Sequence, residues 1–292
     1  MVSLNITKGR IHQIRNIPRK ARQARLPWIP LTIMFVLLVC ACFAPLLAPH
    51  DPQKISILEA KLAPGENWTY PLGTDVLGQD MLSRLIYGAR TSVFISLVAL
   101  GTGAVVGTAL GLIAGFRSGW LDVIIMRASD AALGFPTILV AMIIVTILGA
   151  GMENIILAVA VTVWARFARM IRGDVLGIRE LDFVISAQIA GVSTAMIIWR
   201  HIFPNTINTV MVITSLTIGQ VILLEASLSF LGLGLPIGAP AWGIMVAEGR
   251  AVVLDIWWLA LFPGLAITIV VLAFNFFGDW LRDTLDPKLQ RT

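Results

Sequence analysis

The sequence predicts an all-α protein that crosses a membrane six times. Hydrophobic residues make up 57% of its 292 residues and charged residues only 13%, whereas soluble domains average about 45–50% apolar and about 25% charged residues. The apolar residues are grouped into long runs without charge, and basic residues gather between the runs. Runs of about 20 apolar residues cross the ~30 Å hydrocarbon core as helices.

Four runs have no Asp, Glu, Lys or Arg over the length of a span. A fifth contains a single acid, Glu225, and a sixth is short unless Arg166 and Arg169 extend to the interface at its end. The charge-free stretch 226–247 is excluded as a span because it is rich in glycine and proline, and irregular backbone cannot face lipid. The expected spans are 26–49, 91–116, 131–152, 154–165, 205–232 and 256–278.

An even number of spans places both termini on the same side, and the basic residues indicate which side. The tail 1–27 has seven Lys/Arg and no acid, and five more arginines lie within Arg166–Arg200. By the positive-inside rule this side is cytoplasmic. We therefore expect a basic cytoplasmic tail at 1–27, a first transmembrane helix at 28–49, an extracytoplasmic segment at 50–90 and a transmembrane core at 91–292 with a cytoplasmic loop at about 172–205.

That loop is expected to form a helix-turn-helix elbow. A helix ends near Ala190, Gly191 makes the break, Ser193 or Thr194 caps a second short helix, and Pro204 ends it. An exposed apolar face on the first helix suits a groove on a partner protein, and the alternative is a hairpin lying on the bilayer. The residues of this face are Phe183, Ile185 and Ile189.

Small residues on the second span predict close helix packing. Gly103, Gly107, Gly111 and Gly115 recur every four residues and therefore share one helix face. This face can pack statically, or it can slide against a moving helix during transport. Glu225 is the one acid deep in an apolar run, and we expect it to face protein or water. It can belong to the translocation path or gate, anchor a hinge, or lie at the interface.

Residues for metal binding or catalysis are scarce. Cys40 and Cys42 point to nearly opposite faces of a helix, and His12, His50 and His201 are scattered. We expect no catalytic site, no bound metal and no nucleic-acid partner, since the net charge of +5 reflects the basic tail and loop. The chain contains no G-x-x-x-x-G-K-[ST] motif, so any ATP hydrolysis must take place on another polypeptide.

The elbow resembles the coupling loop of ABC importer permeases, E-A-A-x-x-x-G followed by I-x-L-P. The family's Glu is Ile185 here and its later Ile is His201, so the match depends on Ala187, Gly191 and Pro204. The matching positions are Ile185, Ser186, Ala187, Gly191, His201, Phe203 and Pro204.

Three further motifs resemble the C-type permease subunits of dipeptide and oligopeptide importers. They lie at Gly73–Arg90 (G-T-D-x-x-G-Q-D-x-L-S-R-L-x-Y-G-A-R), Glu225–Gly234 (E-A-S-L-S-F-L-G-L-G) and Ala273–Pro287 (A-F-N-F-F-G-D-x-L-R-D-x-L-D-P). Together they cover the chain from about residue 30 to its end.

The resemblance implies a type I ABC importer permease fold in the bacterial inner membrane. Its implied partners are a related permease in a heterodimer, two cytoplasmic ATPases that bind ATP and Mg²⁺, an extracytoplasmic binding protein and membrane lipid. The implied substrates are di- and oligopeptides, with nickel complexes or glutathione as alternatives. Two other classes fit less well: a secondary transporter normally has buried coupling acids and repeats, and only Glu225 fits; a membrane enzyme needs a catalytic cluster.

Overall fold

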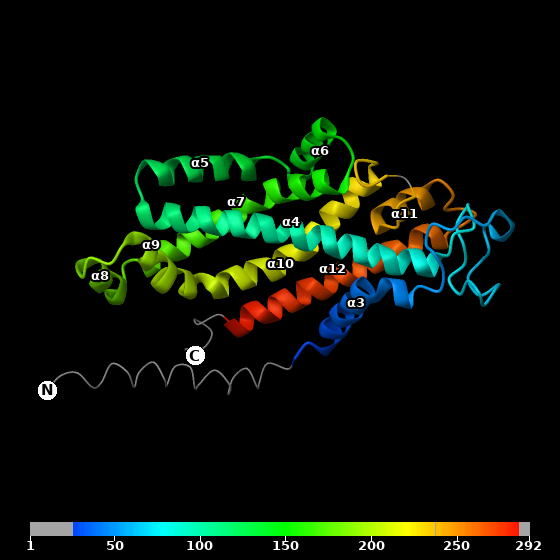
Figure 1. Ribbon diagram of the computed structural model, residues 1–292, viewed down its shortest axis with the longest axis horizontal. Coiled ribbons are helices and arrows are strands. Elements are labelled where there is room, and N and C mark those ends of the chain that lie inside the picture. The colour runs from blue at the N-terminus through cyan, green and yellow to red at the C-terminus, as the bar shows by residue number, and fades with distance from the viewer. Residues whose placement is uncertain (1–25, 237, 286–292) are drawn as a thin grey trace.

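The computed structural model describes residues 26–236 and 238–285. The expected basic tail lies almost entirely outside the described residues, as do Asp286 and Pro287 of the third motif. Long helices run along one axis (Figure 1), and the one β feature in this part of the chain is an isolated bridge between Thr74 and Asp80. The fold is nearly all-helical, as expected.

Five helices are long and apolar enough to cross a membrane, and the number rises to six if one bent pair is counted as a single span. Four of the five are single helices: α3 (Trp28–Leu47), α4 (Met81–Arg117), α7 (Met152–Ile178) and α12 (Trp258–Leu285). The other is Thr194–Phe230, most of which is α10 (Phe203–Phe230). The bent pair is α5 (Trp120–Gly134) with α6 (Thr137–Leu148), and shorter elements are η1 (Ile57–Glu59), α8 (Asp182–Ile189), α9 (Thr194–Ile197), η2 (Ile198–Ile202) and α11 (Trp242–Arg250).

The third expected span is not a straight helix. The run 131–152 is broken at Phe135 and Pro136, where α5 and α6 meet at an angle of 94°. Proline disfavours helical backbone in the residue before it, and Phe135 accordingly has extended φ/ψ angles of −99° and 146°. The expectation that 131–152 forms one uninterrupted helix was therefore wrong.

The fourth expected span was drawn too short. Helix α7 continues through the arginines to Ile178 and has 27 residues. Two of these arginines meet acids of α5: Arg172 Nε lies 2.5 Å from Asp122 Oδ1, and Arg169 pairs with Asp130. Because ion pairing lowers the cost of a charge near lipid, the helix does not have to end where the arginines begin.

The four glycines of α4 lie against α7, which runs parallel to it. A Cβ atom at Gly107 would stand 2.2 Å from the Trp164 carbonyl oxygen, and one at Gly111 would stand 2.6 Å from that of Ala168. A Cβ atom at Gly115 would stand 2.6 Å from Val175 Cβ, and one at Gly103 would stand 3.1 Å from the Ala160 carbonyl oxygen. The two backbones can approach this closely only because these side chains are absent.

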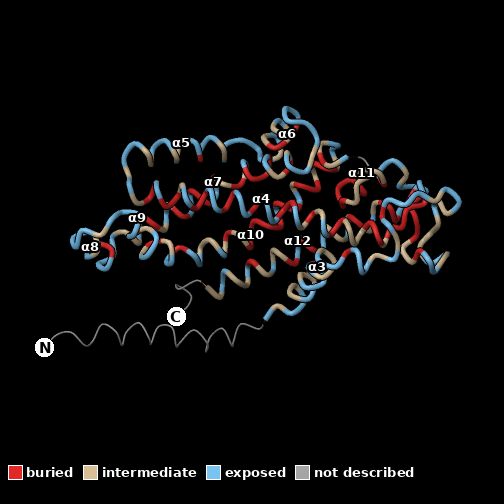
Figure 2. The backbone as a smooth tube through the Cα atoms, in the orientation of Figure 1, coloured by how far each residue is buried: buried red, intermediate tan, exposed pale blue. Residues whose placement is uncertain are grey.

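The bundle has two different ends (Figure 1). The α8–α9 elbow lies at one end, and the segment 50–80 lies with α11 at the other. Buried backbone follows α4, α7 and α10 along the middle, whereas the outer helices are widely exposed (Figure 2). Much of that exposed surface is apolar, with Phe35, Val105 and Ile147 each more than 60% exposed, which suits a lipid surrounding.

Candidate functional site

The elbow turns at Gly191, where φ is +75°. The Gly191 amide donates to the Gln188 carbonyl at 3.0 Å, and the Val192 amide donates to the Ala187 carbonyl at 3.1 Å. This pair of bonds with a left-handed residue is the Schellman ending of a helix, which favours glycine. The break expected at Gly191 is present, and it follows directly from the glycine.

One side of the elbow packs on the bundle, and the other is exposed among the described residues. Val184, Ile197 and Ile202 are buried with residues of α4 and α7, and Ala187 packs against this cluster. Ala187 therefore seats the elbow on its own bundle and is not on the exposed face. That face carries Phe183, Ile185 and Ile189, and Ile189 is 83% exposed.

Pro204 does not end a helix, contrary to expectation. It lies in the first turn of α10, directly after the π-helical turn η2, where the Phe203 amide already bonds to the Ile198 carbonyl and the regular i→i−4 pattern is interrupted. Helix α9 passes through the π-helical turn η2 into α10 without a loop, so Thr194–Phe230 forms one helix of 37 residues. On this rod Trp199 stacks on Phe203 at 5.2 Å, and His201 lies 6.2 Å from the ring of Phe183.

Glu225 is fully buried in α10. Ser92 Oγ of α4 lies 3.1 Å from one of its carboxylate oxygens, and Ser229 Oγ lies 2.9 Å from the other. The bond from Ser92 joins α4 to α10 through side chains, and the bond from Ser229 stays within α10. In this structure Glu225 lines neither the mid-bundle cavity described next nor the bundle surface.

A cavity of about 290 Å³ lies between the α5–α6 bend, α7 and α10. Arg166 Nη1 of α7 donates to Gln220 Oε1 of α10 across 2.5 Å. The residues that line this cavity are Leu133, Thr137, Ile138, Thr162, Val163, Arg166, Thr217, Gln220, Val221, Leu223, Leu224 and Ser227. Sequence reasoning treated Arg166 only as the end of a span, although Gln220, a carboxamide within an apolar run, was a visible signal.

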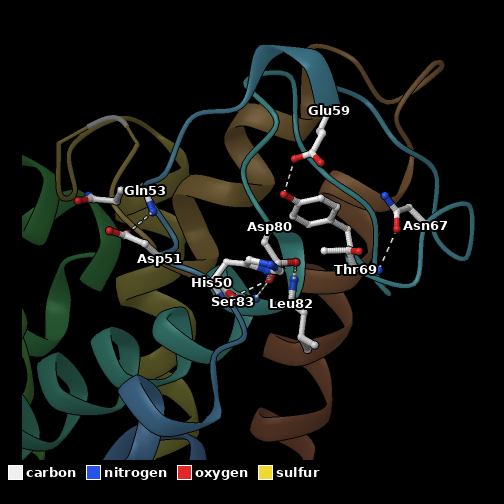
Figure 3. Close-up of polar contacts among 10 residues, drawn as sticks. His50, Asp51, Gln53, Glu59, Asn67, Thr69, Asp80, Leu82 and Ser83 are labelled. Carbon is white, nitrogen blue, oxygen red and sulfur yellow. Dashed lines mark hydrogen bonds and ion pairs between the residues drawn. The ribbon is translucent and has the colours of Figure 1, made fainter.

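Buried charges hold the opposite end together. Arg84 of α4 pairs with Asp75, and its Nη2 lies 2.7 Å from Glu248 Oε2 of α11. Asp80 caps α4 by accepting from the amides of Leu82 and Ser83, each at 3.2 Å (Figure 3). Asp75, Asp80 and Arg84 are at most 2% exposed. The Gly73–Arg90 motif therefore builds a buried junction here.

Two further contacts order the segment 50–80. His50 Nδ1 lies 3.1 Å from Asp80 Oδ2, and the Tyr70 hydroxyl donates to Glu59 (Figure 3). The bond to Glu59, together with burial, raises the pKa of Tyr70 to about 12. No group of three or more His, Cys, Asp or Glu that could hold a metal occurs among residues 26–236 and 238–285.

Comparison with known proteins identifies the family. The profile of the family described as "Binding-protein-dependent transport system inner membrane component" matches residues 107–291. A glutathione transport system permease protein, GsiD, from Pectobacterium atrosepticum is 42% identical, with 88% of this chain and 86% of the relative covered.

Two dipeptide transport system permease proteins, DppC, are similarly related. The protein from Alkalihalophilus pseudofirmus is 38% identical over 93% of this chain and 89% of its own length. The protein from Bacillus subtilis is 37% identical over 94% and 85%. The matched profile covers well over half of the chain, and the helical bundle with its apolar surface agrees with it. The chain thus belongs to the family of binding-protein-dependent transport system inner membrane components and is a multi-pass membrane protein.

Proposed function

We propose that this chain is a permease subunit of an ATP-driven ABC importer that takes up dipeptides or other short peptides. The observation that carries the proposal is the agreement of its relatives. Proteins named for dipeptide or glutathione transport are 37–42% identical to this chain over at least 88% of its length. Both names denote peptides, so the shared substrate class is a short peptide with a terminal carboxylate.

In this proposal the elbow couples transport to a separate ATPase. Its apolar side chains Phe183, Ile185 and Ile189 are exposed, Ile189 to 83%, and such a face suits a groove on a partner. By the positive-inside rule, the arginines between Arg166 and Arg200 favour a cytoplasmic location for this end. The end formed by the segment 50–80 and α11 then faces the binding protein.

The proposed complex holds one related permease, two ATPase subunits and a binding protein. This chain forms half of the translocation path, and ATP and Mg²⁺ bind to the ATPases. With ATP hydrolysis elsewhere, no catalytic residue is required of this chain, and its work is to change conformation when the elbow moves.

Uptake into liposomes that hold the purified complex tests the proposal. The complex with its binding protein should accumulate a labelled dipeptide only when ATP is inside with the ATPases. Uptake driven by an ion gradient without the ATPases would show a secondary transporter instead.

Glutathione is the second candidate substrate, because the relative at 42% identity is named for its transport. Competition separates the two: excess glutathione should abolish dipeptide uptake only if both use the same complex. Uptake of a nickel complex with no uptake of either peptide would reject both candidates.

A further inference from the structure

Helix α7 contains three arginines, and they differ in the charge of the side chains that they contact. Arg172 makes two bonds to Asp122, at 2.5 and 2.7 Å, and Arg169 pairs with Asp130. Arg166 contacts the neutral carboxamide of Gln220, and no carboxylate within 4 Å of it is found in the described part of the chain. Its positive charge is therefore uncompensated.

Arg166 lies far from both ends of α7. It is about 21 Å from Met152 and about 18 Å from Ile178, at 1.5 Å per residue. Arg166 and Gln220 are both exposed on the isolated chain. A cation on a membrane-spanning helix costs a few kcal/mol to expose to lipid, so we expect this face to meet water or protein.

The cavity beside Arg166 contains a second unsatisfied group. Thr217 is 3% exposed, and its Oγ1 has no hydrogen-bond partner in the described structure. The hydroxyls of Thr162 and Ser227, in contrast, each donate to a carbonyl of their own helix at 2.7 Å. The Oγ1 of Thr217 is itself buried, so the Thr217 side chain must rotate toward the cavity before the hydroxyl can donate to a ligand there. That donation would remove the free-energy cost of a buried hydroxyl without a partner.

We propose that this cavity is a carboxylate-binding subsite on the translocation path. Arg166 pairs there with the C-terminal carboxylate of the passing peptide, Gln220 holds the guanidinium in place, and Thr217 donates its hydroxyl to the same carboxylate. The apolar wall of Leu133, Ile138 and Leu224 lies against the side chains of the peptide. The inference rests on the proposed function and assigns a substrate contact to this chain.

The chemistry of the site favours a carboxylate over other occupants. A guanidinium presents paired N–H donors that match a carboxylate in geometry, and every linear peptide with a free C-terminus has this group. The remaining polar groups of the lining are neutral, so they accept peptides of varied sequence without a fixed charge requirement.

The test compares variants of the complete complex reconstituted in liposomes. The substitutions are Arg166→Gln, Arg166→Lys, Thr217→Val and, as a matched loss of charge outside the cavity, Arg127→Gln on α5. Each complex is assayed for subunit composition, for ATP hydrolysis stimulated by the loaded binding protein, and for uptake of one dipeptide and its C-terminal amide. Uptake is compared at equal occupancy of the binding protein, which removes the selectivity of that protein.

The proposal expects Arg166→Gln to lower dipeptide uptake roughly tenfold or more, as loss of a charged hydrogen bond does. Subunit composition and ATP hydrolysis should not change, the amide should be transported no faster than before, and the variant should no longer distinguish the two peptides. Arg166→Lys should keep most of the uptake, Thr217→Val should reduce it several-fold, and Arg127→Gln should behave as wild type.

Three results would overturn it. Wild-type discrimination in Arg166→Gln would remove the arginine from the path. Loss of the second permease from the Arg166→Gln complex would show that the counter-charge is a carboxylate of that partner. A wild-type complex that transports neither peptide would reject the proposed function and the subsite together. This outcome is seen with the wild-type complex alone, so it can be told apart from a failure of the subsite.

Discussion

Gly107 makes the closest approach of the four glycines in the α4–α7 seam. We predict that Gly107→Leu disrupts this seam, because even its Cβ would lie 2.2 Å from the Trp164 carbonyl oxygen. Overpacking of this kind costs about 1–3 kcal/mol or more. The expected result is lower yield and earlier thermal unfolding in mild detergent.

Gly101 provides the control for this substitution. It lies on the same helix, with no atom within 4 Å of its Cβ position, so Gly101→Leu should unfold at the temperature of the wild type. Equal stability of the two leucine variants would mean that α4 and α7 are further apart than the structure has them.

Tyr70 should make the stability of the segment 50–80 fall at alkaline pH. Its pKa is raised to about 12, first by donation to Glu59 and then by burial. A raised pKa in the folded state stabilises the fold below the ordinary value of about 10, and this contribution is lost as pH rises from about 10 to about 12. Tyrosinate absorbance should therefore show one late-titrating tyrosine, which Tyr70→Phe removes, since the chain has only two tyrosines.

The junction between the segment 50–80, α4 and α11 depends on Arg84. We predict that Arg84→Met loosens the whole segment, because it leaves the buried carboxylate of Asp75 and the partly buried one of Glu248 unpaired. Breaking such a buried pair costs about 3–5 kcal/mol. Trypsin should then cleave after Lys54 and Lys61 faster than in wild type. Arg90→Met, an exposed change on the same helix, should leave the cleavage rate unchanged. Equal cleavage rates for the two variants would show that the Arg84 junction does not stabilise the segment.

Two substitutions at Gly191 separate the effect of the turn geometry from the effect of an added charge. Gly191 has φ of +75° and open space around its Cβ position, and both Asp and Asn tolerate that backbone better than other residues. We predict that Gly191→Asp weakens ATPase recruitment and uptake, since it places an unpaired charge in the proposed contact. Gly191→Asn should retain both. Normal recruitment by the aspartate variant would favour the alternative in which the elbow lies on the lipid surface.

Sequence reasoning succeeded where a local signal decides the element and failed where distant residues decide it. The turn at Gly191 follows from one glycine, and close packing along α4 follows from the spacing of four. The full length of α7 could not be inferred, because the acid that pairs with Arg172 is 50 residues away in the sequence. The cavity beside Arg166 likewise joins residues 54 apart. The bend at Pro136 has a local signal, the proline itself, but a search for runs without charge does not detect it.

For the whole molecule, the two ends should lie on opposite sides of the membrane. After Cys40 and Cys42 are replaced, single cysteines at Leu58 and Ile189, which are 100% and 83% exposed, report on the two ends. An impermeant thiol reagent added to intact cells should label the cysteine at 58 and leave the one at 189 unlabelled until the cells are opened. The reverse pattern would invert the orientation.

The unbroken helix Thr194–Phe230 gives the molecule a mechanical property. Since α9, η2 and α10 join without a flexible loop, a movement of the elbow is expected to tilt the whole helix as a rigid rod. Gln220 lies 17 residues beyond Phe203, about 26 Å along the rod, and Glu225 lies further on. A tilt of a few degrees at the elbow end would therefore shift the Gln220 wall of the cavity by an ångström or more.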